Sequence, residues 1–413
     1  MSDSNRTQLS FAKENAWGLF PTTAGTPQVD LRMTGESFGF NIANITSGEI
    51  RSDRQITDLI QTGADVSGGF DFEISYDDNG FAELFKGALY AAAWSTPISS
   101  YRSSLEMDAG AVYGYLALLA YQNFTSFVTG QWIKVTGFST SGATATDNGS
   151  YFIVNCRTTG LDVLPNIPVN TTSTDNGTAL GLLVQGCYVR NGTTESSYSF
   201  ERYHADVTQY FDFKGNVPNT LALTVAANEV VKGSFGFIGK TVTRTATPGS
   251  AETHTEAAET DVMTGITNVG RIMEGYPSQT AGSNSFSTVD SSLVIQQISF
   301  NLTNNVRGLS GINYLGFLDI GVGNLNVNGT LNAYFKDGSF YDKYIASTAT
   351  GLAFELRDSD GNTYIFTFPK IKISTEPINA SGQNQDIMDN ISWQAIRHPT
   401  LEYTMQVDKM PAV

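Results

Sequence analysis

The sequence predicts a mainly β protein made of two tandem β-sandwich or β-barrel domains, each with one short packed α-helix, plus a small inserted all-β domain. Three observations support this prediction. Apolar residues alternate with a period of two along much of the chain, helical patterns are few, and two parts of the chain match each other in the same order. With 413 residues, the chain is long enough for two or three domains.

Alternation of apolar and polar residues predicts half-buried strands, because successive side chains of a strand point to opposite faces of the sheet. Such series occur in both halves of the chain, so we expect strands in both. The clearest series are Phe70, Phe72 and Ile74; Leu221, Leu223 and Val225; Phe235 and Phe237; Leu331, Ala333 and Phe335; and the denser run Tyr364, Ile365 and Phe366.

Two segments have helical patterns. In the first, apolar residues recur at helical spacing from Phe81 to Leu89, behind the candidate capping residues Asp78 and Asn79. In the second, which spans 52–60, a possible capping box precedes apolar residues that would share one face of a helix. We therefore expect one short helix at 81–89 and a second, shorter one at 52–60.

An internal repeat is the most informative feature of the sequence. Two sets of residues, far apart along the chain, match at nearly constant offsets, and the matched units have the same series of turn, strand and aromatic helix. Asp58, Val66 and Gly68 match Asp319, Val327 and Gly329 at an offset of 261; Phe81 and Phe85 match Phe340 and Tyr344 at 259; Phe200, Glu201, Asp206, Tyr210 and Val217 match Phe354, Glu355, Asp360, Tyr364 and Ile371 at 154.

The change in offset from 259 to 154 places 259 − 154 = 105 additional residues in the first copy, between its helix and its later strands. Alternating runs within these residues predict a small all-β module. The polar stretch Thr241 to Thr260 has no apolar periodicity and is expected to be an exposed loop or a linker between the two copies. The predicted boundaries are 1–95 for the first domain, 96–195 for the insert, 196–245 for completion of the first domain, 246–285 for a linker, and 286–413 for the second domain.

Charge and composition exclude some classes of protein. Forty acidic and 24 basic residues give a net charge of −16, which argues against a protein that grips nucleic acid by neutralising phosphates. Only 15% of the residues are charged, against about 25% in an average soluble protein. Because Lys and Glu are depleted at contact surfaces between proteins, this composition favours a protein that assembles with copies of itself.

Cysteine content and hydropathy narrow the cellular setting. Cys156 and Cys187 are too few for a disulfide framework and lack the spacing of a zinc site, so both are expected to be buried thiols. The segment Met1 to Ser10 lacks the apolar core of a signal peptide. Apolar stretches such as 113–121 are far shorter than the roughly 20 residues of a membrane-spanning helix. We expect no membrane association.

Motifs that suggest chemistry are incomplete. Residues 35–39 match the G-x-S-x-G of a hydrolase, but the pattern continues as a strand, and His204, His254 and His398 lie in unrelated contexts. Residues 239–241 match only the end of a phosphate-binding loop. The turn at Asp358, Asp360 and Gly361 suits calcium or a tight hairpin, and the hairpin is favoured. We expect no enzyme, no catalytic residue, no cofactor and no metal site.

Six motifs resemble the tail tube proteins of long-tailed, non-contractile bacteriophages. Together they cover most of the chain outside the insert, which departs from the usual pattern. The motifs are LRMTGESF at 31–38, SGEIRSDRQ at 47–55, GGFDFEI at 68–74, YFDFKG at 210–215, GSFGF at 233–237 and FTFPKI at 366–371.

The resemblance implies a structural subunit with tail-tube-type domains, which forms stacked rings around a channel for DNA. Each domain would give strands to an inner β-barrel, with its helix outside and long loops joining ring to ring. Since one chain holds two such domains, three chains are expected to build a pseudo-six-fold ring. The implied partners are other copies of the chain, the tape measure, tail terminator and tail tip proteins, and genomic DNA in transit without specific binding. The implied location is the virion tail, after assembly in the host cytoplasm.

Arg51, Asp53 and Arg54 form a polar segment between two predicted strands. We expect it to lie at a subunit or ring-stacking contact, and a solvated loop is the alternative. An acidic lumen that repels DNA phosphates is a further hypothesis.

The insert is expected on the outer surface of the tube, where it either binds sugars weakly through Trp132 and nearby aromatic residues or braces neighbouring rings. The main alternative for the whole chain is a secreted or surface β-rich adhesin that binds carbohydrate. Such a protein needs a signal sequence, and tubes or rings seen by negative-stain microscopy would distinguish the two functions.

Overall fold

The computed structural model describes most of the chain, with gaps that lie mainly in the insert. No helix in the part it describes is long and apolar enough to cross a membrane. The described residues are 3–21, 27–101, 105–109, 114–118, 124–137, 148–158, 160–165, 173–175, 183–249, 254–277, 286–288, 293–378 and 382–412.

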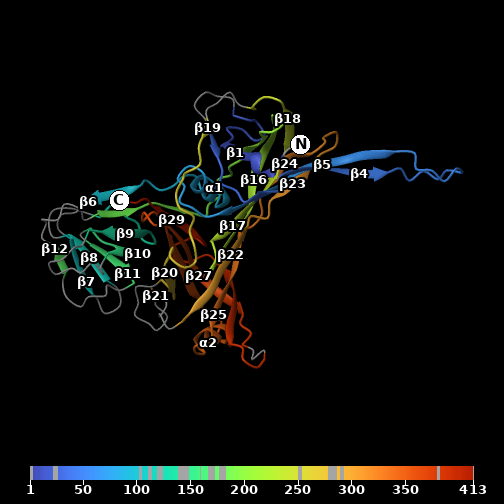
Figure 1. The fold of residues 1–413 in the computed structure, drawn as a ribbon. Helices are drawn as coiled ribbons and strands as arrows, with labels where there is room; N and C mark the ends of the chain where they lie inside the picture. The colour runs from blue at the N-terminus through green and yellow to red at the C-terminus, as the bar shows by residue number, and fades with distance from the viewer. Residues whose placement is uncertain are drawn as a thin grey trace.

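The prediction of a mainly β fold is confirmed, because strands dominate the chain and only two short α-helices occur among the described residues (Figure 1). The first segment starts with a 3-10 helix at Ser4–Arg6. Its strands and helix are β1 (Thr7–Lys13), β2 (Gln28–Asp30), β3 (Gly35–Glu36), β4 (Gly39–Thr46), β5 (Leu59–Glu73), α1 (Phe81–Ala88), β15 (Tyr198–His204), β16 (Gln209–Ala226), β17 (Lys232–Gly239) and β18 (Thr241–Thr245).

The second segment has a closely similar series of elements. The short strand β19 (His254–Thr255) precedes it and pairs with β2. The elements are β20 (Val269–Glu274), β21 (Ser287–Thr288), β22 (Ile295–Thr303), β23 (Arg307–Ser310), β24 (Phe317–Gly321), β25 (Asn326–Tyr334), α2 (Ser339–Ile345), β26 (Thr350–Arg357), β27 (Thr363–Thr375), β28 (Met388–Ala395) and β29 (Gln406–Met410).

Strand pairing has the same order in both segments. In the first, β4, β5, β17 and β16 are neighbours, and β16 also pairs with β15 and β18. In the second, β22, β25, β28 and β27 are neighbours, and β27 also pairs with β26 and β29. The β4–β5 hairpin before α1 therefore corresponds to the β22–β25 hairpin before α2. The strands that follow the two helices correspond as well.

An antiparallel ladder between β16 and β22 joins the two segments into one continuous sheet. It runs from the pair Thr220 and Thr303 to the pair Ala226 and Gln297. The order of strands across this joint sheet is β4, β5, β17, β16, β22, β25, β28 and β27. The backbone hydrogen-bonding groups at one sheet edge of each segment are therefore paired with the other segment of the same chain.

One face of the joint sheet carries the core. Aromatic rings pack closely within each segment, with the centroids of Phe200 and Phe237 4.7 Å apart in the first and those of Phe368 and Trp393 4.9 Å apart in the second. A single buried cluster includes residues of both segments, so the two halves share one hydrophobic core. Its members on the joint sheet include Phe70, Phe72, Leu221, Leu223, Phe235, Phe237, Phe300, Leu331 and Trp393.

The predicted helix near residue 81 is confirmed as α1, but neither Asp78 nor Asn79 caps it: its N-cap is Gly80, without a side-chain hydrogen bond, and Asp77 holds the turn before it. The Asp77 carboxylate accepts the N–H groups of Asn79 and Gly80, each at 2.9 Å. The helix packs its aromatic face on the sheet, and the Phe85 ring contacts Tyr364 of β27 edge-on at 5.6 Å. Helix α1 of the first segment therefore also holds the second segment.

The insert forms a sheet of its own, at the left of Figure 1. The order of its strands is β12, β7, β8, β11, β10, β9, β13 and β6. Strand β14 (Tyr188–Arg190) leads back to the first segment and pairs with β29 of the second. The strands are β6 (Ile98–Tyr101), β7 (Leu105–Ala109), β8 (Gly114–Leu118), β9 (Trp132–Thr136), β10 (Gly149–Cys156), β11 (Gly160–Leu164), β12 (Ser173–Asp175) and β13 (Leu183–Gly186).

Two local predictions are wrong, those for 52–60 and 241–260. The segment 52–60 is not a helix: it forms an exposed loop followed by the start of β5, and no core lies near its apolar side chains. The stretch 241–260, predicted to be a loop, contains β18, which backbone hydrogen bonding to β16 holds at the edge of the sheet. The predicted linker 246–285 contains β20, which pairs with β26 as β1 pairs with β15.

The division into domains at these boundaries stays a prediction. Both cysteines are free thiols in the structure. Cys187 is buried and Cys156 is half-buried, so the expectation of burial holds fully for the first alone.

Candidate assembly surfaces

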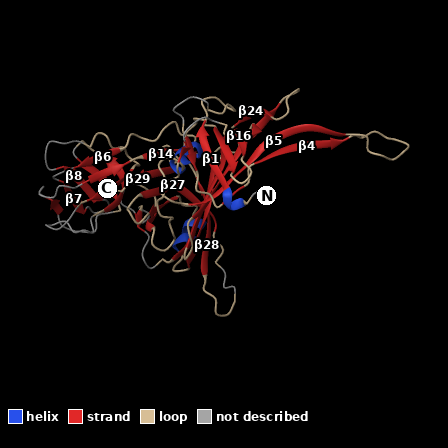
Figure 2. Cartoon of the chain, turned by 45° about the horizontal axis from the view of Figure 1, so that its top comes forward, coloured by secondary structure: helices blue, strands red, loops and turns tan. Residues whose placement is uncertain are grey.

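The β4–β5 hairpin forms a long arm that leaves the body of the molecule (Figures 1 and 2). Arg51, Asp53 and Arg54 lie at its tip. Arg51 Nη2 lies 2.9 Å from Asp53 Oδ2, and this ion pair lowers the pKa of Asp53. Arg54 has a positive φ of 60°, and its N–H donates to the Arg51 carbonyl oxygen, so the tip is a tight turn.

Large apolar side chains follow the arm and are exposed to solvent. Ile50, beside the ion pair at the tip, is fully exposed. Contiguous exposed apolar groups of this kind mark surfaces that bind another protein. The set is Phe40, Ile42, Ile45, Ile50, Ile56, Leu59 and Ile60.

The β23–β24 hairpin is a second, shorter arm that leaves the body on the same side (Figures 1 and 2). Its exposed apolar side chains are Leu309, Ile312, Tyr314, Leu315 and Leu318. No sequence-based prediction pointed to this surface. The available signal was a cluster of large apolar residues in a glycine-rich stretch that lacks strand alternation.

The face of the joint sheet opposite the core is polar and carries small side chains. Ser299 Oγ and Thr330 Oγ1 lie 2.7 Å apart in a hydrogen bond across two strands. This polar face consists mainly of Ser67, Gly69, Thr220, Ala222, Thr224, Ser234, Gly236, Ser299, Asn301, Thr303, Asn328, Thr330, Asn332, Ser392 and Gln394. It is largely free of charge because hydroxyl, amide and glycine residues dominate it.

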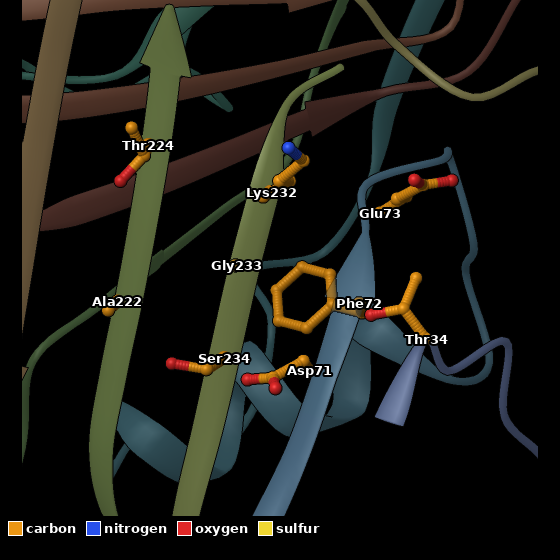
Figure 3. A pocket seen from close by; sticks show the side chains of 9 residues that line it. All are labelled: Thr34, Asp71, Phe72, Glu73, Ala222, Thr224, Lys232, Gly233 and Ser234. Atoms are coloured by element: carbon orange, nitrogen blue, oxygen red, sulfur yellow. The ribbon is translucent and has the colours of Figure 1, made fainter. Parts of the chain in front are cut away.

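Three charged residues of the polar face lie together at one end, while Asp65 lies on the same face farther along β5, where it accepts a hydrogen bond from Ser67. Asp71 and Glu73 of β5 lie next to β17, where Lys232 is the register partner of Glu73. They line a hollow of about 410 Å³ together with Thr34, Phe72, Ala222, Thr224, Gly233 and Ser234 (Figure 3).

Trp132 is part of the seam between the insert and the second segment. Its side chain is buried, and its Nε1 donates to Thr367 Oγ1 at 2.7 Å. The indole packs on Phe152 and Phe286, at 5.5 and 6.2 Å between centroids. The prediction that Trp132 binds sugars is therefore wrong, because its ring has no free face for a ligand.

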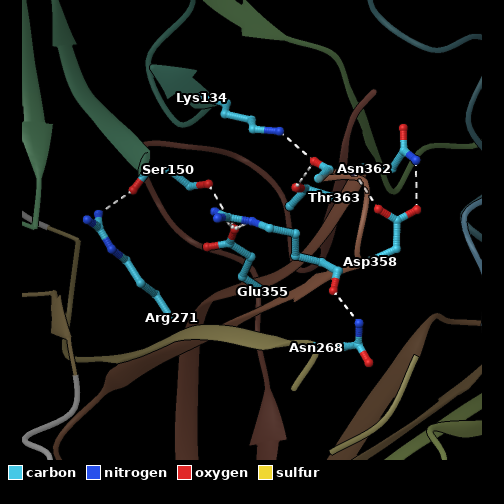
Figure 4. Close-up of polar contacts among 10 residues, drawn as sticks. Lys134, Ser150, Asn268, Arg271, Glu355, Asp358, Asn362 and Thr363 are labelled. Carbon is cyan, nitrogen blue, oxygen red and sulfur yellow. Dashed lines mark hydrogen bonds and ion pairs between the residues drawn. The ribbon is translucent and has the colours of Figure 1, made fainter. Parts of the chain in front are cut away.

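Polar contacts surround this seam (Figure 4). Lys134 Nζ donates to the Gly361 carbonyl oxygen, and Ser150 Oγ donates to Glu355 Oε1 at 3.2 Å. Arg271 Nη1 donates to the Ser150 carbonyl oxygen at 2.6 Å. The insert belongs to the first segment along the chain but is fixed to the second by apolar and polar contacts.

Asp408 of β29 is a buried carboxyl group in the same seam. Its Oδ1 accepts a hydrogen bond from the backbone N–H of Trp132 at 3.2 Å, and its Oδ2 accepts one from Gln406 Nε2 at 2.7 Å. Burial raises the pKa of Asp408 to about 8, although these hydrogen bonds and Arg190 oppose the shift. The group is therefore mainly protonated in the folded protein at neutral pH.

The structure does not bring the hydrolase-like residues together. Ser37 Oγ accepts the Gly69 N–H at 3.2 Å at the start of the arm. His204 hydrogen-bonds to Thr7, His254 lies beside Asp30, and His398 stacks on Tyr276.

The residues with calcium-like spacing form a hairpin turn between β26 and β27. Asp358 Oδ1 accepts the Asn362 N–H at 2.8 Å, and Asp358 Oδ2 accepts from Asn362 Nδ2 at 2.7 Å. Gly361 has a φ of 98°, which suits glycine in such a turn. The favoured hairpin interpretation is confirmed by this geometry.

Comparison with known proteins supplies the family. The model of the family described as phage tail tube protein matches residues 4–395, which include both segments and the insert. No curated protein matches the chain. Because the family match covers nearly the whole chain, the resemblance predicted from the motifs is confirmed, and this chain belongs to the phage tail tube protein family.

Proposed function

We propose that the chain forms rings that stack into the tail tube of a long, non-contractile phage tail, and that DNA passes through the tube on ejection. The family establishes a structural component of the virion tail. Assembly in the host cytoplasm, and contacts with the tape measure, tail terminator and tail tip proteins, belong to the proposal. Family membership favours this function over the adhesin that the sequence left open.

The observation that carries the proposal is the ladder between β16 and β22. Two segments with equivalent strands pair edge to edge, so their polar faces form one surface on the side of the joint sheet opposite the core. A repeated edge-to-edge contact closes into a ring when the rotation it imposes completes a circle. Three chains would then supply six equivalent positions and leave no exposed sheet edge.

The polar face suits the wall of a channel for DNA. Hydroxyl and amide side chains dominate this face, and it has few cationic side chains that could neutralise phosphates. A DNA duplex would therefore not be held by electrostatic attraction. The acidic pair Asp71 and Glu73 lies at one end of the face, where it would repel phosphates over about a Debye length of 8 to 10 Å. This supports the hypothesis of an acidic lumen.

The two arms suit contacts between stacked rings. Both leave the body on one side, and both carry exposed apolar groups that burial against a neighbouring ring would remove from water. Arg51, Asp53 and Arg54 at the tip of the long arm would add polar contacts to that interface.

The mass of a single ring tests the proposal. Native mass spectrometry of rings, together with electron microscopy of the same sample, should show three chains per ring around a central hole. Rings of six chains would contradict the three-chain arrangement. A monodisperse single chain under all assembly conditions would contradict a ring-forming subunit.

A further inference from the structure

We propose that residues 38–41 of one chain pair antiparallel with residues 375–378 of the next chain, in the register of the ladder that joins β16 to β22. This inference rests on the proposed ring and assigns the residues that close it. The pairs would be Phe38 with Ile378, Gly39 with Pro377, Phe40 with Glu376, and Asn41 with Thr375.

The ladder within one chain provides the pattern. Thr220 lies opposite Thr303, and the pairing continues to Ala226 opposite Gln297. The Ala227 N–H donates to the Gln296 carbonyl oxygen, and the Asn304 N–H donates to the Asn219 carbonyl oxygen, each at 2.8 Å. Residues of β16 with odd numbers therefore direct their backbone hydrogen bonds to β22, and those with even numbers direct them to β17.

The arm strand β4 and the strand before it correspond to β22. In the second segment Leu302 lies opposite Val327, and in the first Phe40 lies opposite Val66, the residue that matches Val327. By this equivalence, residues 300–303 of the second segment correspond to residues 38–41 of the first. The Ser37 N–H donates to the Gly69 carbonyl oxygen of β5, so Phe38 and Phe40 direct their backbone groups away from β5.

The end of β27 corresponds to the part of β16 that pairs with β22. Phe237 lies opposite Gly68, and Trp393 lies opposite Gly329, which aligns β17 with β28. Gly236 then pairs with Thr220, and Ser392 pairs with Thr375.

A bulge confirms this alignment, because both strands have one extra residue at the same place. The register of β16 shifts between Pro218 and Thr220, and that of β27 shifts between Ile373 and Thr375. Residues 220–223 of β16 therefore correspond to residues 375–378 at the end of β27.

The edge residues are compatible with this pairing. Pro377 has no N–H group, and it falls at the position of Ala222, where that group would point to the neighbouring strand of its own chain and not to the next chain. Among the described residues, β5 pairs with one side of β4, and β28 pairs with one side of 372–375, beyond the end of the β26 ladder at Ile371, so the opposite sides are open. Phe40 and Thr375 are exposed in the single chain.

An ion pair covers the first of these edges in the single chain. The Phe38 N–H donates to Glu36 Oε2 at 3.0 Å, and Arg202 Nη1 donates to the Phe38 carbonyl oxygen at 3.3 Å. These are the backbone groups that Ile378 of the next chain would bind. At the closed ladder inside the chain, Ile298 and Leu356 replace Glu36 and Arg202, so the pair is a feature of the open edge.

Engineered disulfides test the register. Asn41 and Thr375 would form a pair without mutual hydrogen bonds, whose Cα atoms in antiparallel sheets lie about 4.5 Å apart, within the range of a disulfide. Both are exposed, so the N41C/T375C variant should fold. On oxidation it should give linked species of two and three chains on a non-reducing gel, which reductant returns to single chains.

Two matched variants control the experiment. T220C/T303C places cysteines at the equivalent positions inside one chain and should form a disulfide without linking chains. N44C/T375C moves one cysteine by three residues, about 10 Å along the strand, and should link no chains. The parent chain, which retains Cys156 and Cys187, gives the background.

The outcomes separate the register from the proposed function. Rings in the microscope without linked chains in N41C/T375C, while T220C/T303C oxidises, would overturn the register and leave the ring-forming function intact. Equal linking in N44C/T375C would also overturn it. Failure of the parent chain to form rings or tubes would count against the proposed function itself.

Discussion

Arg202 Nη1 lies 2.8 Å from Oε1 of Glu36, and the two side chains together occupy the open backbone of Phe38. The guanidinium group also lies over the rings of Phe211 and Phe213, at 5.0 and 5.1 Å from their centroids. Charged side chains at a sheet edge are a known means of preventing premature pairing with another chain. In the proposed ring, this pair would protect the edge until the next chain displaces it.

Replacing Arg202 by Gln should lower the protein concentration at which rings or tubes form, because the Phe38 carbonyl oxygen loses its charged donor. Light scattering during a concentration series measures this threshold. The control is R244Q, which removes an exposed arginine that hydrogen-bonds to Gln209 on the neighbouring strand. A threshold for R202Q that is equal to or above that of R244Q would contradict protection of the edge.

The hydrogen bond between Trp132 and Thr367 should be coupled in a double-mutant cycle. W132F leaves the buried Thr367 hydroxyl without its donor, at a cost of about 1 to 3 kcal/mol in free energy of unfolding. T367V leaves the indole N–H unsatisfied at a similar cost. Urea unfolding of both single variants and the double variant should show that the double loses less than the sum. Additive losses would mean that this bond does not fix the insert.

Stability should fall as pH rises through neutrality, and Asp408 should contribute to the fall. In the unfolded chain this carboxyl is ionised above about pH 4. In the folded protein its pKa is about 8, so between pH 6.5 and pH 8 only the folded state holds the proton. The resulting loss is roughly 2 kcal/mol across this window. The pKa of His398 is lowered to about 4 in the folded protein, whereas an unfolded histidine titrates near pH 6.5, so His398 opposes the fall only at the lower end of the window.

D408N should flatten this part of the pH profile, because an amide stays neutral in both states. Urea unfolding of the parent and of D408N at pH 6.5, 7.2 and 8.0 measures the difference. Parallel profiles for the two proteins would show that Asp408 is not the titrating group.

Replacing Arg51 and Arg54 together by Ala should block the stacking of rings into tubes. The exposed tip makes no contact with the core, so the free energy of unfolding should change by less than about 0.5 kcal/mol. Electron microscopy should show separate rings where the parent forms tubes. A second variant, I50S, removes the fully exposed apolar group beside them and should have the same effect. Normal tubes from both variants would show that the tip is a solvated loop.

The sequence predicted those elements whose side chains follow a local period. The alternation at Phe70 and Phe72 and the aromatic spacing of Phe81 and Phe85 predicted strand β5 and helix α1, because both bury one face. The same reasoning failed at Ile56. Its spacing predicted a helix face, but the arm carries this residue away from any core that would stabilise a helix.

Contacts between residues far apart in the sequence could not be predicted, because no local sequence pattern indicates them. Trp132 finds its partner Thr367 at a separation of 235 residues, so its aromatic side chain suggested a ligand site where the fold uses it as a structural anchor. Strand β18 was missed because an edge strand with mostly exposed side chains needs no apolar alternation. Arg51, Asp53 and Arg54 could be placed between strands from the sequence, but the length of the arm depends on tertiary structure.

The covalent joint between the two segments has a kinetic consequence. The ladder from Thr220 to Ala226 forms within one polypeptide, so its strands meet at an effective concentration that does not depend on how much protein the host makes. In the proposed ring of three chains, only three intermolecular encounters would be needed for six joints. Half of the contacts that close the ring would thus be complete when each chain folds.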